Sequence, residues 1–196
     1  MAAAYHQREL TDPRTMRALA HPIRLALLEL LIHAGPLTAT EAGERIAESP
    51  ASCSFHLRQL AKYGFVEEAP RAGGGRRRPW RATQHGMRFS DVHEDPETTQ
   101  AAIGLERVLR DRNLRRAQAG LEERLAMPPE WRSVLGASDF TLYATPDELK
   151  AIDDELLALF RRYRERISDP EKRPEGSRPI QLLLMAYPYR PGGRLD

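Results

Sequence analysis

Four helix-start signals follow one another within the first 50 residues, and this spacing constrains the fold more than any other feature of the chain. A capping residue followed by proline is typical of a helix start, as is a threonine followed three residues later by glutamate. These signals are Asp12-Pro13, Pro22, Thr38 with Glu41, and Ser49-Pro50. We therefore expect four short helices, the last two separated by a tight turn.

The apolar residues of these segments predict which face of each helix is buried. In the helix that follows Ser49-Pro50, Cys53, Leu57 and Leu60 recur at helical spacing, and the helix ends at Gly64. The partners of Cys53 in this stripe favour a small core residue over a nucleophile or half of a metal site with His56.

After Gly64 the pattern changes to a short β-hairpin. Residues 65–68 predict one strand, the sequence RAGGGRRR at 71–78 a turn, and residues 79–83 the returning strand, with Trp80 packing at its base. The turn is basic. Helix, helix, tight turn, helix and basic hairpin is the order of a winged helix-turn-helix domain.

Positive charge is concentrated in this part of the chain, although the whole chain has a formal net charge of only +2. Residues 51–90 carry eight Arg or Lys side chains against two carboxylates, a net charge of +6. Residues 1–50 have a net charge of −1 and residues 91–196 of −3. A local surplus of this kind indicates a polyanionic partner or a solvated basic face.

A long polar helix is predicted from Asp95-Pro96 to about Ala126. Its apolar stripe is sparse, and pairing with a second copy of the chain would bury it. The stripe consists of Leu105, Val108, Leu109, Leu114, Ala117, Leu121 and Leu125. We therefore expect a homodimer assembled through residues 96–127.

The remaining residues predict a strand, a helix and a strand. Residues 140–144 are apolar enough for a strand, Thr145 begins an amphipathic helix with a capping box, and residues 180–187 read IQLLLMAY. The two strands would pair in parallel with a right-handed crossover.

The predicted fold class is mainly α with small β (α+β). Residues 1–90 are expected to form a winged helix-turn-helix DNA-binding domain. Residues 91–196 are expected to form a long dimerisation helix and a small C-terminal strand-helix-strand unit.

The outer face of the helix over residues 50–62 is the predicted contact with double-stranded DNA. Serines bond base edges or phosphates, arginine binds guanine or phosphate, and phenylalanine contacts a thymine methyl group. The arginines of the hairpin would contact phosphates. The predicted DNA-binding residues are Ser52, Ser54, Phe55, His56, Arg58, Gln59, Lys62, Arg71, Arg76, Arg77 and Arg78.

Three stretches carry a family resemblance: ALAHPIRLALLELL at 18–31, SPASCSFHLRQLAKYGFVEEA at 49–69 and GGGRRRPWRAT at 73–83. Over residues 13–90 the chain resembles the ArsR-type winged-helix transcriptional regulators. The resemblance implies a homodimeric repressor whose DNA binding responds to an effector, with the recognition helix at 50–62. The expected site is an inverted-repeat operator.

The chain departs from the metal-responsive members of that family. Their helix before the recognition helix carries two or more cysteines, whereas here it reads EAGERIAE. The predicted dimerisation helix, residues 96–127, contains no histidine, which is the other common metal ligand. We therefore expect no metal site and no cofactor, and a non-metal cue. Whether a small molecule is the effector stays open.

Other function classes are less well supported by the residues. No apolar run is long enough for a membrane span, and no signal peptide is recognised, so the expected location is cytoplasmic. Catalysis is not expected, because the C-terminal residues hold no histidine, cysteine or glycine-rich phosphate loop. A winged-helix protein-interaction module without DNA binding stays as the alternative.

Overall fold

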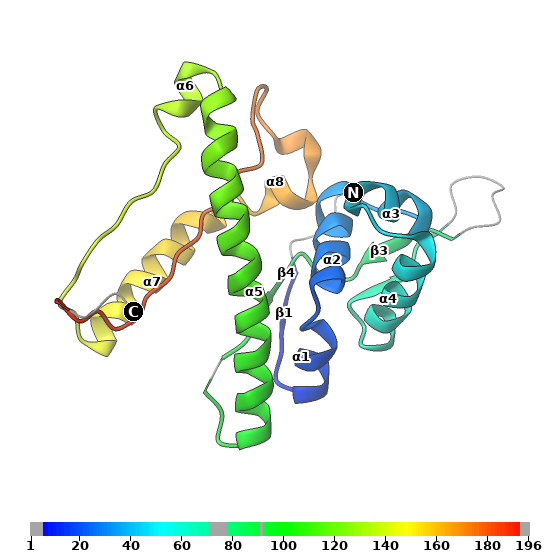
Figure 1. Cartoon of the computed structure of the whole chain (residues 1–196), viewed down its shortest axis with the longest axis horizontal. Helices are drawn as coiled ribbons and strands as arrows, with labels where there is room; N and C mark the ends of the chain where they lie inside the picture. The colour runs from blue at the N-terminus through cyan, green and yellow to red at the C-terminus, as the bar shows by residue number, and fades with distance from the viewer. Residues whose placement is uncertain (1–5, 71–77, 91, 193–196) are drawn as a thin grey trace. The chain divides into compact units, whose positions relative to one another are not determined.

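The computed structural model describes residues 6–70, 78–90 and 92–192, which form two compact units. The first unit comprises Met1–Arg112 and Tyr163–Pro174, and the second comprises Asn113–Arg162 and Glu175–Asp196. Figure 1 shows the order of the helices and strands along the chain. The predicted domain boundary at residue 90 stays a prediction.

The first two helices begin where the capping signals predict. Helix α1 spans Pro13–Leu19, and the Asp12 carboxylate accepts the Thr15 backbone N–H at 2.8 Å and the Thr15 hydroxyl at 2.6 Å. Helix α2 spans Pro22–Ala34 and ends at Gly35. Its N-terminus is capped by the ring of His21, which the sequence analysis did not foresee.

Helices α3 and α4 form the predicted helix-turn-helix pair. Helix α3 spans Ala39–Ile46 and has the predicted capping box between Thr38 and Glu41. Helix α4 spans Pro50–Lys62 and is capped by the Ser49 hydroxyl. In the turn between them Ala47 adopts the left-handed conformation with a φ of 57°.

The predicted hairpin is present as two short antiparallel strands. Strand β2 spans Val66–Glu68 and strand β3 spans Trp80–Ala82, with Val66 opposite Ala82. Trp80 also exchanges two backbone hydrogen bonds with Leu37, at 2.7 and 3.0 Å, and packs against the core. The predicted role of Trp80 at the base of the hairpin is confirmed.

A second strand pair was not predicted from the sequence. Strand β1 spans Gln7–Glu9 and runs parallel to strand β4, which spans Gly86–Arg88. The backbone N–H of Leu10 donates to the carbonyl of Arg88 at 2.8 Å, and the Leu10 side chain is buried. This pair connects the N-terminal residues to the segment after the hairpin.

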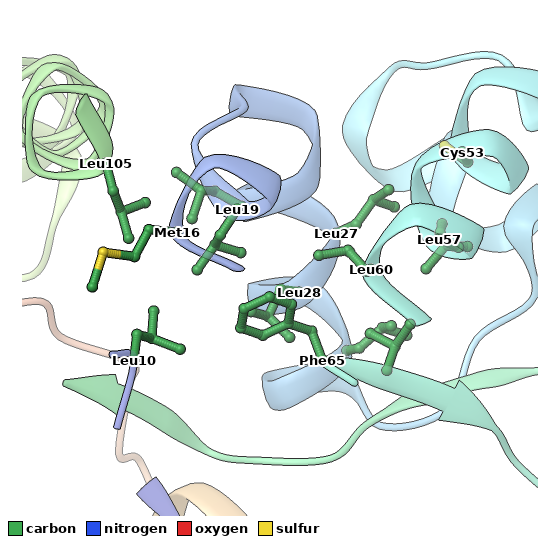
Figure 2. Packing of buried hydrophobic residues seen from close by; sticks show 14 of the residues in the cluster. Leu10, Met16, Leu19, Leu27, Leu28, Cys53, Leu57, Leu60, Phe65 and Leu105 are labelled. Atoms are coloured by element: carbon green, nitrogen blue, oxygen red, sulfur yellow. The ribbon is translucent and has the colours of Figure 1, made fainter. Parts of the chain in front are cut away.

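One hydrophobic core holds the first unit together (Figure 2). It joins α1, α2, α3 and α4 to Phe65, which is fully buried at the end of α4. Cys53, Leu57 and Leu60 lie in this core, so the predicted inner face of α4 is confirmed. Burial raises the pKa of the Cys53 thiol, which makes it a poor nucleophile.

Helix α5 spans Pro96–Glu123 and continues as the 3-10 helix η1 over Arg124–Ala126, as predicted. Its N-terminal part packs on the core through Ala101, Ala102 and Leu105. From Asn113 onward the helix belongs to the second unit, and there its leucines are exposed.

The second unit contains two further helices. Helix α6 spans Pro129–Arg132 and helix α7 spans Pro146–Arg161, the latter with the predicted capping box at Thr145. The chain then returns to the first unit with helix α8 at Glu165–Ser168 and the 3-10 helix η2 at Pro170–Lys172.

The predicted C-terminal strands are absent, so the strand-helix-strand prediction is wrong for this unit. Residues 140–144 and 180–187 form no strand, and no described residue of the second unit is buried. An apolar run becomes a strand only when a neighbour accepts its backbone hydrogen bonds, and an isolated pair of short strands is marginally stable at best unless a helix or a third strand packs against it. Hydrophobicity alone therefore misled the prediction.

Among the described residues, no helix is both long and apolar enough to cross a membrane.

The turn between α3 and α4 depends on a glycine. A Cβ atom on Gly43 would lie 2.5 Å from the backbone oxygen of Glu48. The change Gly43→Ala should therefore lower the free energy of unfolding by roughly 1–3 kcal/mol, because the backbone must shift. Urea unfolding followed by circular dichroism measures this.

Gly104→Ala is the matched control, because a Cβ atom there meets nothing within 4 Å. Gly104 lies inside α5, so alanine should stabilise the helix by about 0.5–1 kcal/mol. Equal effects of the two substitutions would contradict the proposed tight turn.

Candidate DNA-binding surface

The outer face of helix α4 is exposed to solvent because its inner face is buried in the core. Arg58 and Lys62 are exposed, and the ring of Phe55 is 52% exposed. Ser52, Ser54 and Gln59 are half-buried at the edges of this face. The structure therefore brings most of the predicted recognition residues together on one side of one helix, while their contact with DNA stays a prediction.

Local structure at both ends of helix α4 fixes the orientation of its exposed face. At the N-terminus the Ser49 hydroxyl accepts the Ser52 backbone N–H at 3.1 Å. At the C-terminus the chain turns at Gly64, where φ is 72°, and leads into buried Phe65. With both ends held, the exposed face cannot rotate without breaking the core.

His56 differs from the other predicted DNA-binding residues because its ring lies against helix α2. The ring centroids of His56 and His21 are 4.5 Å apart, and those of His56 and Phe55 are 5.1 Å apart in an edge-on arrangement. Burial, followed by the nearby His21 and Arg24, lowers the pKa of His56. The sequence pattern did not indicate His21 and Arg24 as part of this surface, because they lie near His56 only through the packing of two different helices.

The hairpin carries both cations and carboxylates. Arg78 forms an ion pair with Glu68, and Arg81 forms one with Glu67 at 2.7 Å. The hydrogen bond from Arg78 to Glu68 raises the pKa of Arg78. The predicted contacts Arg71, Arg76 and Arg77 lie outside the described residues. Part of the positive charge of the hairpin is therefore compensated by its own glutamates.

No group of three or more His, Cys, Asp or Glu side chains that could hold a metal ion occurs in the described ranges. The absence of a metal site in the protein stays a prediction.

The comparison with protein families matches residues 19–69 to a model described as a helix-turn-helix domain. The match covers helices α2, α3 and α4 and strand β2. With the β2–β3 hairpin, this part of the chain is a winged helix-turn-helix domain. That class agrees with the resemblance to ArsR-type winged-helix regulators.

Solved structures of Lactococcus lactis ZitR also match the chain. A double mutant in apo form is 16% identical, with 74% of this chain and 83% of that chain covered and a TM-score of 0.34. A second structure of that mutant is 16% identical, with 73% and 75% covered and a TM-score of 0.32. A single mutant is 14% identical, with 74% and 73% covered and a TM-score of 0.29.

No curated protein matches the sequence significantly.

The ion pair between Arg78 and Glu68 generates a prediction for DNA affinity. Glu68→Gln releases Arg78 and removes one negative charge beside it, so binding to duplex DNA should tighten several-fold at low salt. The log-log salt slope should steepen by up to about 0.9 if Arg78 gains a phosphate contact. Fluorescence anisotropy over a range of salt concentrations measures both quantities.

Glu106→Gln is the matched control. It releases Arg110 from an ion pair of 2.9 Å on helix α5, outside the candidate surface, and changes the net charge by the same amount. Equal tightening by the two substitutions would show that total charge alone governs affinity and that Arg78 has no special position.

Proposed function

We propose that this protein is a sequence-specific DNA-binding transcription regulator that acts as a homodimeric repressor. The observation that carries the proposal is the outer face of α4, where Arg58, Lys62 and Phe55 are exposed within the most basic window of the chain. The helix-turn-helix match over residues 19–69 supports the same conclusion.

In the proposed complex, helix α4 lies in the major groove and the hairpin follows the sugar-phosphate backbone. Arg58 binds the acceptor edge of guanine, Gln59 the edge of adenine, and Phe55 a thymine methyl group. Ser52 and Ser54 bond to base edges or to phosphates. Sequence-independent contacts come from His56, Lys62, Arg71, Arg76, Arg77 and Arg78.

The proposed dimer forms through residues 96–127. Leu114 and Leu121 in α5 and Leu125 in η1 are exposed, and Leu125 is 71% exposed. A leucine stripe of this kind on a long helix is a liability for a monomer, and a symmetry-related copy would cover it. If a two-fold axis relates the two copies, their α4 helices contact half-sites in opposite orientations. The operator is then an inverted repeat.

The signal to which the regulator responds is proposed to be something other than a metal ion. Helix α3 has no cysteine and helix α5 has no histidine, so neither carries the ligand types that metal-responsive relatives would need. The proposed location is the cytoplasm.

Selection of binding sites from random duplex DNA tests the proposed function. The wild-type protein should retain duplexes that share one motif. Arg58→Ala and Ser54→Ala should each change the preferred base at one position of each half-site, with about 1–3 kcal/mol of discrimination lost there. Sequencing of the retained DNA gives the result.

Arg107→Ala on helix α5 is the control for loss of positive charge, and it should leave the motif unchanged. A wild-type protein that retains no DNA would instead support an interaction module without DNA binding. The same motif from all variants would show that the outer face of α4 does not read bases.

The dimer has its own test. A variant with Leu114→Glu and Leu121→Glu should sediment as a monomer at micromolar concentration, because four charges would then face one another across the interface. Val134→Glu, at a residue that is 76% exposed in the same unit, is the control and should leave the dimer intact. A monomeric wild type would refute the proposed interface.

A further inference from the structure

Three basic side chains meet where helix α2 packs against helix α4. His21 caps α2, Arg24 lies one turn further along that helix, and His56 belongs to α4. The two histidine rings are 4.5 Å apart, and both rings as well as the Arg24 side chain are half-buried. This basic cluster consists of His21, Arg24 and His56.

Two nitrogen atoms of the basic cluster are buried without a hydrogen-bond partner. They are Nε of Arg24 and Nδ1 of His56. Burial lowers the pKa of Arg24, and Tyr63 acts on it in the opposite direction. An unpaired guanidinium that is partly removed from water is costly, so the cluster lacks an acceptor that would offset this cost.

No carboxylate of the described residues supplies that acceptor. Glu48 is the acidic group that acts electrostatically on both histidines, yet it forms neither an ion pair nor a hydrogen bond with any member of the cluster. Because the three side chains are only half-buried, their exposed parts are open to an anion from outside the chain, which would offset the charge of the cluster.

We propose that His21, Arg24 and His56 form a binding site for one phosphodiester group of the DNA backbone, beside the groove that helix α4 enters. This inference rests on the proposed function. The position favours a DNA phosphate over a free anion, because His56 contacts the ring of Phe55, which lies exposed on the outer face of α4. Phosphate contacts at this edge would fix the register of α4 in the groove.

Protonation distinguishes the two histidines. Nδ1 of His21 accepts the backbone N–H of Ile23 at 3.2 Å, so a proton on that atom would break the cap of α2. His21 is therefore held neutral, with the hydrogen on Nε2, and can donate from that atom. His56 has no such bond and is the ring that can take up a proton.

The sign of the pH dependence follows from the charges around His56. Burial and the neighbouring His21 and Arg24 lower the pKa of His56 in the free protein, whereas Glu48 raises it. A phosphate at the cluster favours the protonated ring and raises this pKa in the complex. The complex then binds more protons than the free protein, so affinity rises as the pH falls.

The experiment measures binding of the full chain to a long random-sequence duplex, as a function of salt and of pH. The variants are Arg24→Gln and His56→Gln, with Arg107→Gln as the control for loss of a cation elsewhere. Arg24→Gln should reduce the log-log salt slope by about 0.9, and Arg107→Gln should leave it unchanged. The wild-type affinity should rise by up to about tenfold per unit fall in pH near neutrality, and His56→Gln should abolish this rise.

A second measurement identifies the source of the phosphate. The ring resonances of His56 are followed by NMR on addition of the duplex and, separately, of inorganic phosphate. The proposal expects the duplex to shift the pKa of His56 upward in the wild type. A shift with inorganic phosphate alone, and an unchanged salt slope in Arg24→Gln, would assign the site to a free anion and overturn the proposal.

The outcomes separate this inference from the proposed function. A wild-type protein that binds DNA, with a salt slope unaffected by Arg24→Gln and an affinity independent of pH, overturns the inference alone. A wild-type protein that binds no duplex overturns both. If Arg24→Gln does not fold, as judged by circular dichroism, the pH profile of His56→Gln decides the question.

Discussion

The burial of one face of helix α4 against α2 and Phe65 is the interaction on which the rest of the structure depends. Leu57 and Leu60 are almost completely removed from solvent, and each such leucine contributes roughly 1.5–3 kcal/mol through burial. Because this face is fixed, the opposite face must point to solvent. The exposure of Arg58 is thus a consequence of core packing, and a change that loosens the core should affect recognition without touching a recognition residue.

Local signals predicted the helices, whereas contacts between distant segments escaped the sequence analysis. Asp12, Thr38, Ser49 and Thr145 cap their helices as expected, because an N-cap depends on residues within one turn. The pairing of β1 with β4 joins residues about 80 positions apart, and no local sequence pattern predicts it. The contact between the rings of His21 and His56 escaped for the same reason.

In the second unit, an apolar run of sequence did not predict a strand correctly. Residues 180–187 are the most continuously apolar run of the chain, yet none of them is buried and they form no strand. A strand requires a neighbour, and the single chain offers none in its described residues. The exposed leucines of helix α5 and the apolar residues of the second unit thus share one property, a lack of burial within the chain, which fits the proposed assembly of two copies.

The central claim is that the outer face of α4 and the adjoining hairpin contact DNA. Amide chemical-shift mapping of the isotope-labelled protein, on addition of a random-sequence duplex, tests it most directly. The largest changes are expected on residues of Pro50–Lys62 and on strands β2 and β3. Changes confined to residues 138–190, or no changes at all, would contradict it.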